Sequence, residues 1–415
     1  MVMSKSESKV INLGCRLNFF ESEVINNILK KDGIQNTIII NTCAVTNHAV
    51  KKSISEVKKA SSKYPNHKIL VTGCASQIDE KSFIKLKNVK KIIDNKTKTR
   101  PDHYNNHPLK EEKSIDFPYL DQFSTSRSRA LLQIQQGCDH RCTFCIIPFG
   151  RGDSKSLPFE EICQRVSGIL KKGFKEIILT GIDLTSYGHD LSGNPKLGNI
   201  LKRLLCLYPE LKRLRLSSID PAEIDDDLLD LLLKDKRLLP HAHLSIQSGD
   251  NMILKRMKRR HNTEQVINLC KKIRSYRPEF TFGADVIVGF PTETDEHFSN
   301  TLKFVKLIDF SNVHVFPFSA KQGTPASRMP QVNEKVKKIR ADILRRESKK
   351  LLHKKLNKTI GKCRRILFES HGKSYTDEFF KVKLTGKKNF DSQPGVVLDI
   401  NVISRNDDTL VAELI

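Results

Sequence analysis

The stretch ALLQIQQGCDHRCTFC, residues 130–145, places three cysteines in a loop directly after a strand-like segment. Cys138, Cys142 and Cys145 follow one another at intervals of four and three residues. Thiols at this spacing could bind zinc, but a closed structural zinc site takes four ligands, and His140 would complete one only in a cramped geometry. We therefore favour a cluster of four irons, in which three thiolates leave one iron open to a substrate.

The residues after this loop continue to alternate between strand and helix. The strand-like segments are ALLQIQQ, EIILTG, RLRLSS, AHLSIQ, TFGADVIVG and NVHVFPFS, with helical patterns such as PFEEICQRVSGILKKG between them. Six such units in about 190 residues predict a partial (β/α)6 barrel of the TIM type, since eight units need about 250. Functional groups in such a barrel lie on loops at the carboxyl ends of the strands, and the cysteine loop is the first of these.

Residues 9–93 predict a separate parallel α/β domain of the Rossmann-like kind. KVINL, TIII, KILV and VKKII have the character of strands, and helical patterns separate them. Cys15, Cys43 and Cys74 each come shortly after one of the first three strands. Since the carboxyl ends of parallel strands share one edge of a sheet, these three thiols could meet in space.

The chain is predicted to have four parts. Residues 1–104 form the amino-terminal domain, 105–128 a linker poor in periodic pattern, 129–355 the barrel core, and 356–415 a small all-β barrel. The last part is inferred from short strand-like segments separated by Gly, Asn and Asp.

Composition bounds the class of protein. The 415 residues carry a formal charge of +25, which favours a polyanionic partner such as RNA, although the composition bias of an AT-rich genome is an equally good explanation. No run of eighteen apolar residues occurs, so we expect a cytoplasmic protein with no membrane span. The chain has ten cysteines, and without signs of secretion they indicate metal or redox chemistry rather than disulfides.

Residues 331–370 concentrate the positive charge. They hold fourteen Lys and Arg against four Asp and Glu, mostly on one predicted helix. Val336, Ile339, Ile343, Leu344, Leu351 and Leu352 are expected to form its packed face. The opposite face is then basic, and a solvated surface is the commoner explanation for such a face.

The ordered motifs bear a resemblance to a known family. They are INLGCRLNFFESE, NTCAVTNHAVKKS, VTGCASQ, QIQQGCDHRCTFCIIPFGRG, LTGIDLTSYG, HLSIQSGDNMILKRMKRRH, ADVIVGFPTET and HVFPFSAKQGTPASRM. Together they resemble the radical S-adenosylmethionine methylthiotransferases, and within that family the bacterial branch that acts on N6-threonylcarbamoyladenosine beside the tRNA anticodon. The likeness runs from about residue 9 to the end of the chain.

The resemblance implies two 4Fe-4S clusters and S-adenosylmethionine as cofactors. Cys138, Cys142 and Cys145 match the ligands of the cluster that binds S-adenosylmethionine, and Cys15, Cys43 and Cys74 match those of a second cluster linked to the inserted sulfur. Residues implied to line the S-adenosylmethionine site are Phe144, Gly181, Asp183, Gln247, Ser248 and Gly289. For Gly181 and Gly289, a tight turn between strand and helix is an equally good explanation.

The implied reaction inserts a methylthio group at carbon 2 of the modified adenosine at tRNA position 37. A 5′-deoxyadenosyl radical would remove hydrogen from that carbon, and the sulfur would come by way of the second cluster. An electron donor of the flavodoxin or ferredoxin type and a sulfur source are implied as partners, with the tRNA anticodon stem-loop as substrate. The tail resembles a TRAM-like RNA-binding barrel, and the residues expected to contact RNA are Lys349, Lys350, Lys354, Lys355, Arg364, Arg365, Lys381 and Lys383.

Phe379 and Phe380 beside these lysines form a mixture suited to stacking on bases, with at most one ring facing outward if the segment is a strand. Asp153 and Lys155 stand where relatives tend to be more basic. Three rival functions stay open at this point: a sister methylthiotransferase acting on isopentenyladenosine in tRNA or on a ribosomal-protein aspartate, an iron–sulfur electron carrier, and a zinc-containing RNA-binding module.

Overall fold

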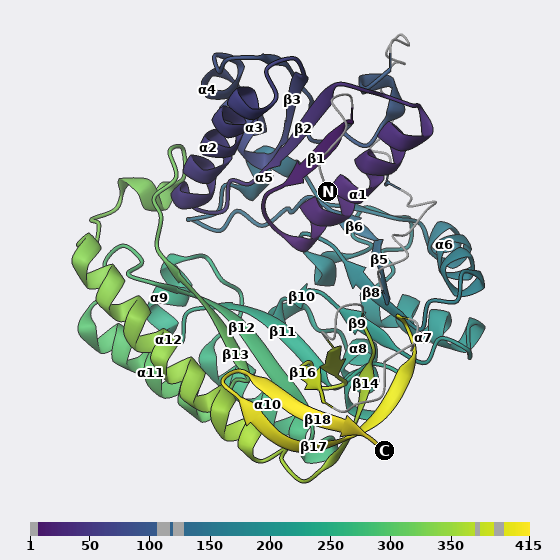
Figure 1. The fold of residues 1–415 in the computed structure, drawn as a ribbon. Helices are drawn as coiled ribbons and strands as arrows, with labels where there is room; N and C mark the ends of the chain where they lie inside the picture. Colours follow the sequence, from purple (N-terminus) through teal and green to yellow (C-terminus); the bar gives the residue numbers. More distant parts are fainter. Residues whose placement is uncertain (1–6, 106–116, 119–127, 370–373, 386–393) are drawn as a thin grey trace. The chain divides into compact units, whose positions relative to one another are not determined.

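The computed structural model describes residues 7–105, 117–118, 128–369, 374–385 and 394–415 (Figure 1). Apart from residues 105, 117, 118 and 128, the predicted linker lies outside this range. The chain divides into two compact units. The first comprises Met1–Phe123, Gln133–Leu157 and Ser319–Ser327, and the second comprises Ser124–Leu132, Pro158–Phe318 and Arg328–Ile415. Within the described residues, no helix combines the length and apolar character needed to cross a membrane.

The first unit is built on the predicted parallel sheet, in the order β1-β2-β3-β4. Its strands are β1 (Lys9–Asn12), β2 (Thr37–Thr42), β3 (Lys68–Gly73) and β4 (Val89–Ile92), and its helices are α1 (Arg16–Lys31), α2 (Asn47–Lys63), α3 (Cys74–Ile78) and α4 (Glu80–Ile84), followed by the short η1 (Pro101–His103). Each pair of neighbouring strands is parallel, as expected for strands joined by helices.

Burial on both faces explains why residues 38–40 of β2 are three consecutive isoleucines. Ile38 and Ile40 pack with Val57 of α2 on one face, whereas Ile39 packs with Ile25 of α1 on the other. A strand covered on both sides shows no alternation of polar and apolar residues. The sheet therefore has helices on both faces, and its carboxyl edge is left for the loops that carry cysteines.

The first unit also contains the loop quoted at the outset. β6 (Gln135–Gln136) pairs with β7 (Lys155–Ser156) in an antiparallel ribbon that closes the segment 133–157 at its base, and α5 (Ile147–Arg151) lies within the loop. Ile146 joins the same core cluster as Val57 and Phe83. The cysteine loop is thus packed on the amino-terminal sheet.

The second unit holds the remaining strands of the predicted barrel. They are β5 (Arg129–Gln133), β8 (Glu176–Thr180), β9 (Leu214–Leu216), β10 (Ser218–Ile219), β11 (His241–Gln247), β12 (Thr281–Val288) and β13 (Asn312–Pro317). They form the sheets β5-β8-β9 and β10-β11-β12-β13. The helices are α6 (Phe159–Lys171), α7 (Leu197–Leu207), α8 (Asp226–Lys234), α9 (Asn251–Arg256), α10 (Thr263–Tyr276), α11 (Asp295–Ile308) and α12 (Glu334–Asn357), with the short turns η2 (Leu184–Ser186), η3 (Pro221–Glu223) and η4 (Pro325–Arg328). The six predicted strand positions are all confirmed.

The basic helix α12 packs differently from the prediction. Ile339 is 58% exposed, and the buried side includes Lys337 and Arg340. Arg340 donates to Glu293 Oε1 at 2.7 Å, and Ser348 Oγ accepts a hydrogen bond from the backbone amide of Val313 in β13 at 3.0 Å. The predicted apolar face is therefore wrong at Ile339, because ion pairs place two cations in the packed face instead.

The carboxyl-terminal residues form a closed barrel with strand order β14-β15-β16-β18-β17 (Figure 1). Its strands are β14 (Cys363–Leu367), β15 (Ser374–Thr376), β16 (Lys381–Leu384), β17 (Val397–Asn406) and β18 (Thr409–Leu414). The core contains Phe380, Val382, Ile400 and Leu410. Closure removes the exposed edges that a small open sheet would present.

This small barrel docks on the amino-terminal ends of the β/α strands. Arg213, just before β9, donates to Asp377 Oδ1 at 2.5 Å, and Thr281, which opens β12, donates to the backbone carbonyl of Glu378 at 2.8 Å. The Phe379 ring stacks with His241 and Tyr375 at centroid distances of 5.2 and 4.9 Å. The Phe380 ring points into the core of the small barrel. The Phe379 ring packs against His241 and Tyr375, so these contacts use the ring that was expected to stack on bases.

Replacement of Phe379 by alanine is expected to loosen this junction. The ring also lies near the guanidinium groups of Arg129 and Arg215, at 5.5 and 4.9 Å. Loss of the stacking and cation–π contacts should lower the free energy of unfolding by about 2 kcal/mol. Urea denaturation followed by circular dichroism measures this. Tyr276→Ala, at an aromatic ring that is exposed, is the matched control and should change stability by less than about 0.5 kcal/mol.

Candidate active site

The three amino-terminal cysteines stand at the carboxyl edge of the first sheet. Cys15 precedes α1, Cys43 directly follows β2, and Cys74 is the first residue of α3. Burial raises the pKa of Cys43 to about 11, and the charges of Cys15 and Cys74 add to this rise. The sheet topology thus brings together three residues that are far apart in sequence.

Gly14 allows the first of these loops to come close to the second. Its φ is +127°, and a Cβ at this position would lie 3.1 Å from Cys43 Sγ. Any larger residue would therefore be strained and would press on the thiol. Glycine is therefore required at position 14 by close packing against Cys43, which the sequence alone did not reveal.

A buried ionic network lies directly beneath Cys74. Arg151 is 1% exposed, and its Nε donates to Cys74 Sγ at 3.3 Å. Its guanidinium also donates to Glu21 at 2.5 and 3.0 Å, and Lys98 Nζ lies 2.5 Å from the same carboxylate. Burial opposes ionisation of Glu21, but the charges of Arg151 and Lys98 outweigh it and lower its pKa. The network therefore holds positive charge against the thiol.

Asparagine side chains tie this network to the backbone. Asn18 Oδ1 accepts from Arg151 at 2.5 Å, and its amide donates to the carbonyls of Leu13 and Thr42 at 2.9 Å each. Asn95 Nδ2 donates to the Gly150 carbonyl at 2.6 Å and lies 3.6 Å from Cys74 Sγ. The loops bearing the amino-terminal cysteines are fixed by these bonds.

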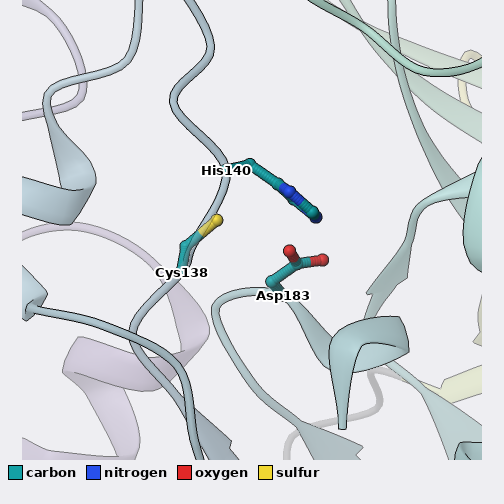
Figure 2. A group of neighbouring side chains, drawn as sticks. All are labelled: Cys138, His140 and Asp183. Atoms are coloured by element: carbon teal, nitrogen blue, oxygen red, sulfur yellow. The ribbon is translucent and has the colours of Figure 1, made fainter. Parts of the chain in front are cut away.

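Backbone hydrogen bonds fix the loop that carries Cys138, Cys142 and Cys145. The backbone amide of Cys138 donates to the Gly152 carbonyl at 3.1 Å, and that of Cys145 donates to the Cys142 carbonyl at 3.0 Å. Gly137 has a φ of +70°, and a Cβ there would lie 1.9 Å from the Asp153 carbonyl oxygen. Figure 2 shows the Cys138 thiol and the His140 ring leaving the loop on the same side. Their possible metal-binding atoms lie within 4.8 Å of each other.

Both cysteine trios belong to the first unit and share supports. α5, which begins just after Cys145, ends in Arg151, the donor to Cys74. Residues 319–327 bridge the same two regions. The amide of Ala326 donates to the Thr143 carbonyl at 2.9 Å, and Asn47 Nδ2 donates to the Ala320 carbonyl at 3.1 Å. Residues 319–327 thus connect the loop that follows Cys43 to the loop that contains Cys142 and Cys145.

In the described part of the chain, neither cysteine trio forms a compact site for a single metal ion. Among the described residues, which include all six of these cysteines, no group of three ligand atoms within 4.8 Å of one another contains two of them. A single zinc ion would draw its ligands closer, because Zn–S bonds are about 2.3 Å. A cubane is wider and accepts thiolates that stand further apart. Three thiolates, one of them beside the positive charge of Arg151, are a donor set that could hold an iron–sulfur cluster.

Five of the residues expected to line the S-adenosylmethionine site lie at the carboxyl ends of strands in the second unit, and Phe144 lies in the first. Asp183 (Figure 2) follows β8 and accepts a hydrogen bond from Ser186 Oγ at 2.9 Å. Gln247 has a φ of +73° at a register shift between β11 and β12. Such a bulge redirects a side chain and is common beside active sites. Gly181 follows β8 directly.

Two of the expected positions have structural explanations. Ser248 is buried, and its hydroxyl accepts from the Asp250 amide at 3.2 Å. Gly289 has a φ of +68°, and a Cβ would lie 2.4 Å from Lys337 Cγ. The tight turn after β12 is thus enough to require glycine there.

The cations expected to bind RNA differ in how they are placed. Lys350, Lys354, Lys381 and Lys383 are exposed. Others form ion pairs: Lys349 with Asp407 at 2.7 Å, Lys355 with Asp309 at 2.5 Å, Arg364 with Glu378 at 2.9 Å and Arg365 with Asp377 at 3.0 Å. Lys355 is also largely buried, and burial lowers its pKa. The number of basic residues in this region is therefore larger than the number of cations free of ion pairs and exposed to solvent.

Arg151, Glu21, Lys98 and Lys321 were missed by the sequence interpretation. One signal was present for Glu21, which falls on the apolar stripe of α1 between Leu17 and Val24. A carboxylate on the buried side of an amphipathic helix needs a partner. Lys321 is likewise a charged side chain in a buried position. Burial lowers its pKa to about 8, whereas the charge of Cys43 acts to raise it.

Comparison with known proteins agrees with these features. The sequence model of the Radical SAM superfamily matches residues 132–305, and that of "Uncharacterized protein family UPF0004" matches residues 7–94. A solved structure of the radical S-adenosylmethionine methyltransferase TsrM from Kitasatospora setae matches with a TM-score of 0.54 and 11% identity, covering 74% of this chain and 71% of that one. This likeness concerns the fold alone.

Curated relatives match over most of their length. "Threonylcarbamoyladenosine tRNA methylthiotransferase MtaB" of Rickettsia prowazekii (strain Madrid E) is 45% identical over 383 residues, 91% of each chain. The protein of the same name from Bacillus subtilis (strain 168) is 34% identical, covering 90% of this chain and 89% of its own. "tRNA-2-methylthio-N(6)-dimethylallyladenosine synthase" of Orientia tsutsugamushi (strain Ikeda) is 32% identical, covering 87% of each. The chain therefore belongs to the tRNA methylthiotransferases of the radical S-adenosylmethionine superfamily.

Proposed function

We propose that this enzyme adds a methylthio group to carbon 2 of N6-threonylcarbamoyladenosine at position 37, next to the tRNA anticodon. The observation that carries this choice of substrate is the 45% identity, over 91% of the chain, to the Rickettsia protein whose name specifies that nucleoside. The Orientia relative named for dimethylallyladenosine, one of several with that name, is 32% identical.

Two 4Fe-4S clusters are part of the proposal. Cys138, Cys142 and Cys145 would hold the cluster that binds S-adenosylmethionine, and Cys15, Cys43 and Cys74 would hold the second. Bound clusters and S-adenosylmethionine would supply the radical and the sulfur that carbon 2 requires, because this carbon is too inert for acid–base chemistry. The chain's own residues bind, orient and exclude water. The packing of both trios on one unit supports the proposal.

The remaining parts are assigned as follows. Residues 1–104 carry the second cluster, 129–355 form the radical core, and 356–415 form a TRAM-like barrel that binds the anticodon stem-loop, with 105–128 as linker. The exposed lysines Lys350, Lys354, Lys381 and Lys383 are the best candidates for phosphate contacts, since exposed cations can release counterions from RNA. A flavodoxin- or ferredoxin-type donor, a sulfur source and a cytoplasmic location complete the proposal.

Nucleoside mass spectrometry of tRNA tests the substrate. Cells that lack the protein are expected to lose the 2-methylthio form of N6-threonylcarbamoyladenosine and to regain it when the wild-type gene is restored. Cells restored with Cys138→Ala, which removes a ligand of the radical cluster, should stay deficient. Loss of methylthio from isopentenyladenosine instead would assign the sister tRNA activity, and loss from a ribosomal-protein aspartate would assign the other.

A further inference from the structure

Lys321 is a buried cation without a hydrogen-bond acceptor. It is 7% exposed, and within the described part of the chain Nζ has no hydrogen-bond partner. The other two buried cations of this region, Arg151 and Lys98, both pair with Glu21. An ammonium group taken out of water without a partner is strongly destabilising. The described residues supply no group that accepts a hydrogen bond from this ammonium, so a bound anion would stabilise it.

Hydrogen bonds fix the Lys321 backbone beside the loop of Cys43. The amide of Asn47, four residues after Cys43, donates to Ser319 Oγ at 2.9 Å, and its side chain donates to the Ala320 carbonyl at 3.1 Å. Thr324 closes the turn from the other side, since its amide and hydroxyl donate to the Lys321 carbonyl at 3.0 and 2.8 Å. The backbone from which the ammonium group extends is therefore fixed by the fold.

The cysteine sulfurs do not satisfy this ammonium group. Cys74 Sγ already has Arg151 Nε at 3.3 Å and Asn95 Nδ2 at 3.6 Å. Lys321 Nζ makes no such bond to any sulfur in the described chain, although hydrogen bonds hold residues 319–320 against the loop that follows Cys43. A tRNA phosphate is a poor candidate, because a side chain that is 7% exposed offers no surface to a nucleic-acid backbone. The acceptor must be small, anionic and held near Cys43.

We propose that Lys321 is a positioning residue that donates a hydrogen bond to an anionic sulfur, hydrosulfide or methanethiolate, held next to Cys43 at the amino-terminal cysteine trio. This inference rests on the proposed second cluster, whose open iron would be the other contact of the sulfur. A charge-assisted bond of this kind favours an anionic ligand over a neutral one and fixes its direction. Lys321 would thus select and orient the sulfur that is to be transferred.

Ligand binding to the isolated second cluster tests the proposal. The full chain with Cys138, Cys142 and Cys145 all replaced by alanine, reconstituted without oxygen, should hold only that cluster. Methanethiolate is titrated into the reduced protein and followed by electron paramagnetic resonance. In this background Lys321→Met should raise the Kd for methanethiolate about tenfold to a hundredfold, because a hydrogen bond to a charged group is lost. Lys321→Arg keeps the positive charge and should raise this Kd by a smaller factor.

Matched controls separate charge selection from general damage. A neutral iron ligand, tert-butyl isocyanide, should bind Lys321→Met within about twofold of the parent, since it offers no charge to the ammonium group. Lys52→Met removes an exposed lysine from α2 and should leave both ligands unaffected. Iron content should be the same in every variant.

Two outcomes would overturn the role of Lys321. One is an unchanged Kd for methanethiolate in Lys321→Met and in a second variant, Lys321→Gln. The other is loss of iron from these variants, which would make Lys321 a support of the cluster rather than of its sulfur. Failure of the two-cluster proposal looks different: the triple alanine protein with Lys321 intact would then hold no cluster.

Discussion

Cys43→Ala is expected to abolish methylthiolation of tRNA while cleavage of S-adenosylmethionine continues within about twofold of the wild-type rate. Cys43 lies with Cys15 and Cys74 at the edge of the first sheet, and it is not among the three thiols proposed to bind the radical cluster. Removing a ligand should cost more than the ten- to hundredfold typical of outer contacts, so product formation should fall by about two orders of magnitude or more. Methionine or 5′-deoxyadenosine release, and nucleoside mass spectrometry, measure the two activities in one reaction.

Two other cysteine variants complete this experiment. Cys138→Ala should eliminate both cofactor cleavage and product, because its thiol belongs to the trio proposed to bind S-adenosylmethionine. Cys206→Ala, at an exposed cysteine of α7, should leave both unchanged. Full methylthiolation by Cys43→Ala would disprove the assignment of the amino-terminal trio to sulfur transfer.

Most strands could be predicted from the sequence because the hydrophobic period is a local signal. KVINL, TIII and KILV each became a strand, and the cysteines after them came to one edge, as the parallel arrangement requires. β15 was not predicted, because its three residues, Ser374–Thr376, are too few to show a period.

The contacts between distant residues could not be predicted in the same way. Arg151 pairs with Glu21 across 130 positions, and neither residue reveals the other in the sequence. The packed face of α12 was assigned by apolar spacing, but Lys337 and Arg340 are buried there because Glu334, Glu293 and Asp295 supply partners. Hydrophobic spacing identifies packed faces only where no buried ion pair competes.

The role of the tail shows a related limit. Phe379 and the nearby lysines had the composition of an RNA-stacking surface, but the ring packs against His241 and Tyr375. Composition cannot distinguish an aromatic ring that meets RNA from one that fixes two parts of the same chain. We still expect the barrel to bind RNA, because the lysines of β16 are exposed.

Arg151→Met is expected to lower the free energy of unfolding by about 3 kcal/mol, because removing one partner from a buried ion pair leaves the other charge uncompensated. Met keeps much of the buried volume but cannot donate to Glu21, Asn18 or Cys74. Lys98 still faces Glu21, so the loss should stay at the lower end for buried pairs. Urea denaturation of the iron-free protein, followed by circular dichroism, measures the change without involving a cluster.

Arg141→Met is the matched control, since Arg141 forms an ion pair of similar length, 2.7 Å to Asp153, on the same cysteine loop. The side chains of Arg141 and Asp153 are both largely exposed, so solvent screens their ion pair. Loss of the pair should lower the free energy of unfolding by less than about 0.5 kcal/mol. The contrast tests whether burial, rather than the presence of an arginine on this loop, gives Arg151 its effect. Equal stability of the two variants would show that the network beneath Cys74 does not support the fold.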